Sequence, residues 1–144
     1  MPIFTYSQTF EEVLSINSLN SFKKVMIENN YQFDIEEEDG HLNYGYGLVK
    51  DEEGSKSQNW GSINKNNLSW ILQFNKKDNF VYEYGYEYYQ ITKNLKEKCT
   101  YLDVFEDDSG NDYVCYSCSE SKYKGKIGFM VKEGSGFIRH FIIE

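Results

Sequence analysis

Residues 80–91 read FVYEYGYEYYQI, and a tyrosine occupies every second position from Tyr82 to Tyr88. Glu83 and Glu87 lie between them, on either side of a glycine. Successive side chains of a β-strand point to opposite faces, so a period of two in β-forming residues predicts a strand with one phenolic and one acidic face. We therefore expect a long, central strand over residues 80–91.

The pattern on both sides of this stretch predicts an α+β fold. Residues 9–28 have helical periodicity, whereas from residue 31 the period changes to two, with Asp39-Gly40 at the tip of a hairpin over residues 31–48. Further strands are expected through Trp60 and at residues 68–74, 101–105, 113–118, 123–131 and 137–143. Together these elements predict one or two N-terminal helices packed on a mainly antiparallel, meander-like sheet of roughly eight strands. A length of 144 residues predicts a single domain over residues 1–144.

The charge of the chain is negative and unevenly distributed. The net charge is −8, and residues 34–53 hold eight acids against one lysine, whereas residues 113–144 hold five bases against three acids. Arg139 is the only arginine. Such a field repels nucleic acid and attracts a basic protein, so we expect no direct binding to nucleic acid.

The first twenty residues and the number of cysteines predict a protein of a reducing cellular compartment. The first twenty residues have no basic segment followed by an apolar core, and no apolar run approaches the ~20 residues of a membrane span. We therefore expect a cytoplasmic protein without membrane contact. The three cysteines are an odd set, and on a strand Cys115 and Cys118 would point to opposite faces. We expect three free thiols, no disulfide, no metal site and no cofactor.

Residue types capable of catalysis are present, but their spacing matches no catalytic motif. Glu83 and Glu87 would lie about 13 Å apart on a strand, farther than paired glycosidase carboxylates, unless an acid such as Asp103 on a neighbouring strand closes the distance. His41 and His140 have no partner motif, and the glycines of residues 44–48 lie within a strand rather than before a helix. We therefore expect a protein that is not an enzyme.

Two acidic blocks flank the first hairpin and have two interpretations. A run of acids is commonly a solvated face, but tyrosines within an acidic field also suit docking of a basic partner. The candidate partner-binding acids are Asp34, Glu36, Glu37, Asp39, Asp51, Glu52, Glu53, Glu83 and Glu87. The candidate aromatic anchors are Tyr44, Tyr46, Tyr84 and Tyr86.

In overall composition, small, acidic, tyrosine-rich and without a catalytic motif, the chain resembles the immunity proteins of bacterial toxin systems, including those of contact-dependent growth inhibition. The resemblance implies a protein that binds and neutralises a co-inherited basic toxin, for example a nuclease, in the cytoplasm of the cell that makes it. The alternative is a small-molecule or carbohydrate-binding β domain, or an enzyme, with a tyrosine-lined pocket.

Overall fold

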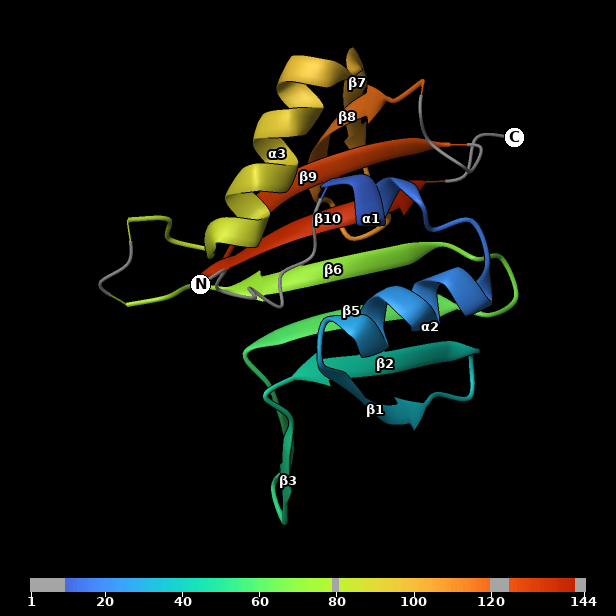
Figure 1. Cartoon of the computed structure of the whole chain (residues 1–144), viewed down its shortest axis with the longest axis vertical. Helices are drawn as coiled ribbons and strands as arrows, with labels where there is room; N and C mark the ends of the chain where they lie inside the picture. The colour runs from blue at the N-terminus through green and yellow to red at the C-terminus, as the bar shows by residue number, and fades with distance from the viewer. Residues whose placement is uncertain (1–9, 79–80, 120–124, 142–144) are drawn as a thin grey trace, which may run out of the picture.

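The computed structural model describes residues 10–78, 81–119 and 125–141 (Figure 1). The helices are α1 (Phe10–Leu14), α2 (Leu19–Glu28) and α3 (Tyr86–Lys98). The strands are β1 (Tyr31–Glu36), β2 (His41–Tyr46), β3 (Val49–Asp51), β4 (Gly54–Lys56), β5 (Asn59–Asn64), β6 (Trp70–Asn75), β7 (Thr100–Glu106), β8 (Asp112–Ser117), β9 (Lys126–Lys132) and β10 (Ser135–Phe141).

Eight of these strands form one antiparallel sheet in the order β1-β2-β5-β6-β10-β9-β8-β7. The strands β3 and β4 pair only with each other and project from the sheet as a hairpin, at the bottom of Figure 1. The three helices lie on one face of the sheet, toward the viewer in Figure 1. The fold is therefore α+β, with two short helices before the sheet, as the sequence predicts.

The sheet consists of two halves with the same order of elements. One half is α2 followed by β1, β2, β5 and β6, and the other is α3 followed by β7, β8, β9 and β10. The fourth strands of the two halves, β6 and β10, pair at the centre. The same type of backbone hydrogen bond closes the first hairpin turn of each half. The Glu37 N–H donates to the His41 carbonyl at 2.7 Å, and the Asp107 N–H donates to the Asn111 carbonyl at 2.9 Å.

The larger of two core clusters lies between the sheet and the helices, and the smaller one contains Tyr113, Cys115 and Phe141. In β5 and β6 alternate residues are buried, which places Ile63, Trp70 and Leu72 against the helix layer. The helices contribute apolar side chains such as Phe22 and Ile91, both fully buried. The period of two predicted for these strands is therefore confirmed, and it separates a buried face from an open one.

The expectation of a strand over residues 80–91 is wrong. Phe80 lies outside the described residues, the five residues before Tyr86 form neither strand nor helix, and α3 runs from Tyr86 to Lys98. Within α3, Tyr88, Ile91 and Leu95 are spaced three and four residues apart, so they fall on one helical face. Tyr88 and Ile91 are buried on that face, and the central positions of the sheet belong to β6 and β10.

The expectation of three free thiols is also wrong. Cys99 and Cys118 form a disulfide with a Cα–Cα distance of 4.6 Å, and Cys115 is free and buried. Cys99 follows the end of α3 and Cys118 follows the end of β8. Because the β7–β8 register pairs Thr100 with Ser117, the two cysteines next to that pair meet. The alternation along one strand could exclude only a pairing of Cys115 with Cys118.

Replacing Ile138 with alanine should lower the free energy of unfolding by about 2–5 kcal/mol, because Ile138 is fully buried on the central strand β10. Denaturant unfolding followed by circular dichroism measures the change. Val131, which is 52% exposed on β9, is the control, and its replacement with alanine should change the free energy by less than about 0.5 kcal/mol. Equal effects at both positions would contradict the central place of β10.

Replacing Cys118 with serine should lower the free energy of unfolding by about 3 kcal/mol, because the bond closes a loop with a sequence separation of 19 residues. The measurement is urea unfolding with and without a reductant. Reductant should destabilise the native chain to the level of the variant and leave the variant unchanged. After the folded chain has been oxidised in air, a thiol titration of the unfolded chain without reductant should find a single thiol, and three would contradict the pairing.

Candidate functional site

The open face of the sheet, opposite the helices, carries a compact group of half-buried side chains. Trp60 and Ser62 on β5, and Ile71 and Gln73 on β6, alternate with buried core residues. The antiparallel register places Trp60 beside Gln73 and Ser62 beside Ile71. These four side chains form a floor with one flat aromatic ring, one aliphatic group and two hydrogen-bonding groups.

This floor belongs to a groove of about 530 Å³. Its walls come from β1, from β2 and from the β3–β4 hairpin. The residues lining the groove are Asp34, Ile35, Glu37, Asn43, Gly54, Ser55, Trp60, Ser62, Ile71 and Gln73. The volume lies within the range of natural ligand sites. Both ionisable residues in this lining are acids.

Asp34 connects one wall of the groove to the sheet. The β1–β2 register shifts between Phe33 and Ile35, so Asp34 is an extra residue at a bulge. Its carboxylate accepts from the Ser55 hydroxyl at 2.8 Å and lies 3.2 Å from the Lys50 ammonium. The Lys50 ammonium also donates to the Asp34 carbonyl at 3.1 Å. The side chain of Asp34 is 7% exposed and holds the β3–β4 hairpin in place.

Glu37 supplies the second carboxylate of the groove. It follows the end of β1 and is exposed, and the Asn43 amide donates to its Oε1 at 2.7 Å. Asn43 pairs with Ser62 in the β2–β5 register, so this hydrogen bond directs Glu37 toward the open face. The adjacent Glu36 instead forms an ion pair with Lys65 at 2.9 Å.

The first hairpin turn brings Glu37, Asp39 and His41 together, with their ligand-type atoms within 4.8 Å of one another. His41 Nδ1 lies 2.8 Å from Asp39 Oδ1, and this hydrogen bond holds the pKa of the Asp39 carboxyl below its usual range. The His41 N–H also donates to Asp39, at 3.1 Å. The hydrogen bonds that close the hairpin turn are sufficient to explain why these three side chains lie close together.

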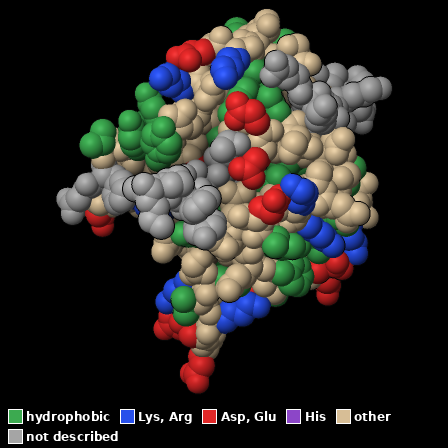
Figure 2. Space-filling view, in the orientation of Figure 1, with side chains coloured by type: hydrophobic (Ala, Val, Ile, Leu, Met, Phe, Trp, Pro, Cys, Tyr) green, Lys and Arg blue, Asp and Glu red, His purple; other side chains and the backbone are tan. Residues whose placement is uncertain are grey.

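Apart from Glu36 and Asp39, which lie at the first hairpin turn, the predicted partner-binding residues fall into three places. Asp34 and Glu37 line the groove, and Asp51, Glu52 and Glu53 lie on the exposed hairpin beside it. Figure 2 shows acidic side chains at the tip of this hairpin, at the bottom of the view. Lys56 partly compensates them, at 3.9 Å from Asp51 and 3.3 Å from Glu53.

The second place is the beginning of α3, which the groove lining does not include. Glu83 and Glu87 lie there, with Tyr84 packed against the core and Tyr86 51% exposed. Tyr86 belongs to a cluster with the half-buried Tyr82 and the exposed Tyr89, whose ring centroids lie 5.5 and 6.5 Å from its own.

The third place is the core itself. Tyr44 is 5% exposed and its ring packs edge-on against Phe22, with centroids 6.0 Å apart, so it is not available as an anchor. Burial raises the pKa of the Tyr44 phenol. Tyr46 packs against the same core and against Tyr31.

Trp60 is the residue that sequence reasoning missed. The strand through Trp60 was predicted, but no role was assigned to its side chain. The signal lay in the alternation around it: Gly61 and Ile63 point to the core, so Trp60 and Ser62 must point away. Large aromatic residues on the face opposite the core are a residue type that is enriched at protein interfaces.

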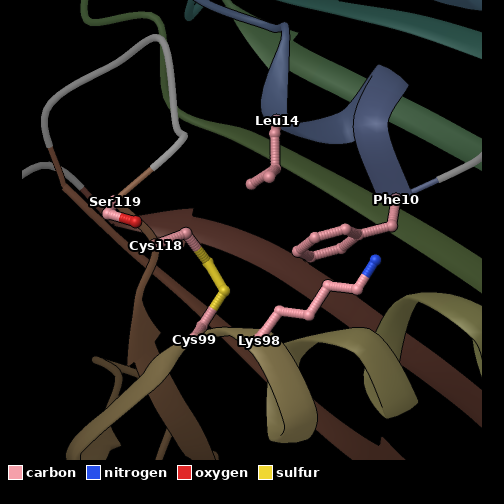
Figure 3. Close-up of a pocket in the computed structure, with 6 residues that line it drawn as sticks. All are labelled: Phe10, Leu14, Lys98, Cys99, Cys118 and Ser119. Atoms are coloured by element: carbon pink, nitrogen blue, oxygen red, sulfur yellow. A yellow bond between two sulfur atoms is a disulfide. The ribbon is translucent and has the colours of Figure 1, made fainter.

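A second cavity, of about 340 Å³, lies beside the disulfide (Figure 3). Phe10 and Leu14 of α1 face the Cys99–Cys118 bond across it, and the side chain of Lys98 extends along the Phe10 ring. The Lys98 ammonium lies 5.9 Å from the centre of that ring. Its lining has one ionisable group, whereas the groove combines a floor of four strand residues with two carboxylates.

Comparisons with known proteins give no relative for this chain: no family model, curated protein or solved structure matches it. In the part of the chain that the structure describes, no helix has the length and apolar character needed to cross a membrane.

Replacing Trp60 with phenylalanine should remove the emission that acrylamide quenches readily, because Trp60 is half-buried whereas Trp70 is 2% exposed. The remaining emission should come from Trp70, lie at shorter wavelength and resist the quencher. Circular dichroism on the variant controls for unfolding. Equal quenching of the native chain and the variant would contradict the open position of Trp60.

Proposed function

We propose that the chain is a non-catalytic binding protein that neutralises a basic protein partner, acting as an immunity protein against a cognate bacterial toxin such as a nuclease. The observation that carries the proposal is the groove: an aromatic floor at Trp60, walls that include the carboxylates of Asp34 and Glu37, and an acidic hairpin next to it.

The electrostatics support a basic partner. The net charge is −8, and eight acids cluster in residues 34–53, which supply two walls of the groove. A nuclease must attract phosphate, so the cleft that it uses is positive. An acidic surface is steered toward such a cleft and can occupy it in place of the nucleic acid.

The groove supports tight docking as well as steering. Interface energy concentrates in a few anchors that enter desolvated pockets, while charges at the rim mainly govern the rate of association. Trp60 and Ile71 provide the apolar contact area, and Asn43, Ser62 and Gln73 provide hydrogen bonds. The anchor proposed for the partner interface is therefore Trp60, in place of Tyr44.

The proposed location is the cytoplasm, where such a toxin would act. Cytosolic thiols are kept reduced, so Cys99 and Cys118 would be present there as thiols. A chain of 144 residues buries enough apolar surface to fold without a disulfide.

The second candidate is a small-molecule or carbohydrate-binding domain, and the same groove is the observation that favours it. Aromatic rings stack on sugar faces, and the Asn43 and Gln73 amides suit hydroxyl groups. In that case the ligand would be neutral and the acids beside the groove incidental, so the response to salt separates the two candidates.

The proposed function predicts that the triple variant Asp51→Lys, Glu52→Lys and Glu53→Lys associates with the basic partner about tenfold more slowly at low salt. The partner is first sought by pull-down with the product of the adjacent gene, and association is then measured at two salt concentrations. Added salt should shrink the difference, because the Debye length falls to ~3 Å at 1 M.

The matched control changes the net charge equally at exposed helix positions: Glu11→Lys, Glu28→Lys and Glu97→Lys. This control should associate nearly as fast as the native chain. Equal slowing in both triple variants would mean that total charge, rather than the hairpin, governs association. No response of rate or affinity to either triple variant or to salt would overturn the proposed function.

A further inference from the structure

We infer that the groove binds one arginine side chain of the partner, with the guanidinium stacked on the Trp60 ring and donating to the Glu37 carboxylate. This inference rests on the proposed function, because it names the group by which the basic partner is recognised.

The charge of the lining selects a cation. Asp34 and Glu37 are both acids, and no lysine or arginine is part of the described lining. The chain itself shows a cation held at one wall, since the Lys50 ammonium lies 3.2 Å from Asp34 Oδ1 and 3.1 Å from the Asp34 carbonyl. Asp34 is therefore already compensated, and Glu37 is the carboxylate available to a ligand.

Glu37 retains the capacity to accept from a ligand. The Asn43 amide occupies one position on Oε1 at 2.7 Å, whereas a carboxylate offers about four acceptor positions. The same bond holds the carboxylate above the row formed by Asn43, Ser62 and Ile71. The guanidinium of arginine, with five donors in a planar fork, matches such an oriented carboxylate.

The position of Trp60 favours arginine over lysine. Trp60 and Gln73 form the next row of the same face, two residues along the strands from Ser62 and Ile71. Two residues of a strand span about 7 Å, which a single long side chain can bridge. A guanidinium stacks on an aromatic ring while its edge still donates, whereas an ammonium is a compact, strongly hydrated point charge.

The test uses acetyl-Gly-Arg-Gly amide with the whole chain, and matched peptides in which citrulline or lysine replaces arginine. Citrulline keeps the shape and removes the charge. Amide NMR shifts and Trp60 fluorescence at low salt report binding. We expect the arginine peptide to bind most tightly and to shift residues of the groove, and citrulline to bind at least about tenfold more weakly.

Two variants locate the contact. Glu37→Gln removes the charge at constant shape and should weaken binding of the arginine peptide about tenfold, whereas Glu38→Gln at the next exposed position should leave it unchanged. Trp60→Phe should weaken the arginine peptide more than the lysine peptide. The inference would be overturned if the arginine and citrulline peptides bound equally tightly, or if Glu37→Gln and Glu38→Gln weakened binding equally. It would also be overturned if no peptide shifted the amide NMR signals of the residues that line the groove.

The same variants separate this inference from the proposed function. If the basic partner binds Glu37→Gln and Trp60→Phe as tightly as the native chain, the arginine site fails while the inhibitor function stands. If the arginine peptide binds in a way that depends on Glu37, but reversal of the hairpin charges and added salt leave partner binding unchanged, the arginine site stands and the proposed function fails.

Discussion

The pairing of β6 with β10 is the constraint on which the rest of the structure depends. It joins two halves that each consist of a helix and a four-stranded meander, and it places Leu72 and Ile138 at the centre of the core. At one end of the pair the Ser135 hydroxyl donates to Asn75 at 3.0 Å and accepts from Gln73 at 3.2 Å. Without this pairing each half would expose an apolar sheet edge, and the helix layer would have no continuous surface to cover.

The groove also depends on β6, which forms its floor together with β5. Its floor is the outward half of the alternation whose inward half is the core, so the side chains of Trp60 and Gln73 are held by strands that cannot shift without disturbing Ile63 and Leu72. The walls are less firmly held. The β3–β4 hairpin is connected to the sheet through Asp34, and every residue of its two three-residue strands is exposed. The floor of the groove is therefore held by the core, whereas the hairpin wall is held mainly by the contacts of Asp34.

The sequence predicted the parts of the fold that are set locally. The Asp39-Gly40 turn and the alternation around it located the first hairpin, and the same period located β5 and β6. The prediction from the sequence failed where tertiary packing determines the secondary structure. The repeat around Tyr84 and Tyr88 is compatible with a strand and with a helix. The burial of Ile91 and Leu95 stabilises the helix. The partner of Cys99, and the presence of Trp60 and Glu37 in the lining of one groove, depend on strand registers between distant segments, which no spacing along the chain reveals.

The central place of β10 also bears on the order in which the chain can fold during synthesis. Asn75 and its partner Ser135 are 60 residues apart, and a ribosome adds roughly 5–20 residues per second, so β6 waits about 3–12 s for its neighbour. During that interval β6, and then β9, each present an open edge of the kind that recruits foreign strands. The nascent chain should therefore depend on chaperone protection until β10 has been made, even though the strands within each meander are joined by neighbouring segments.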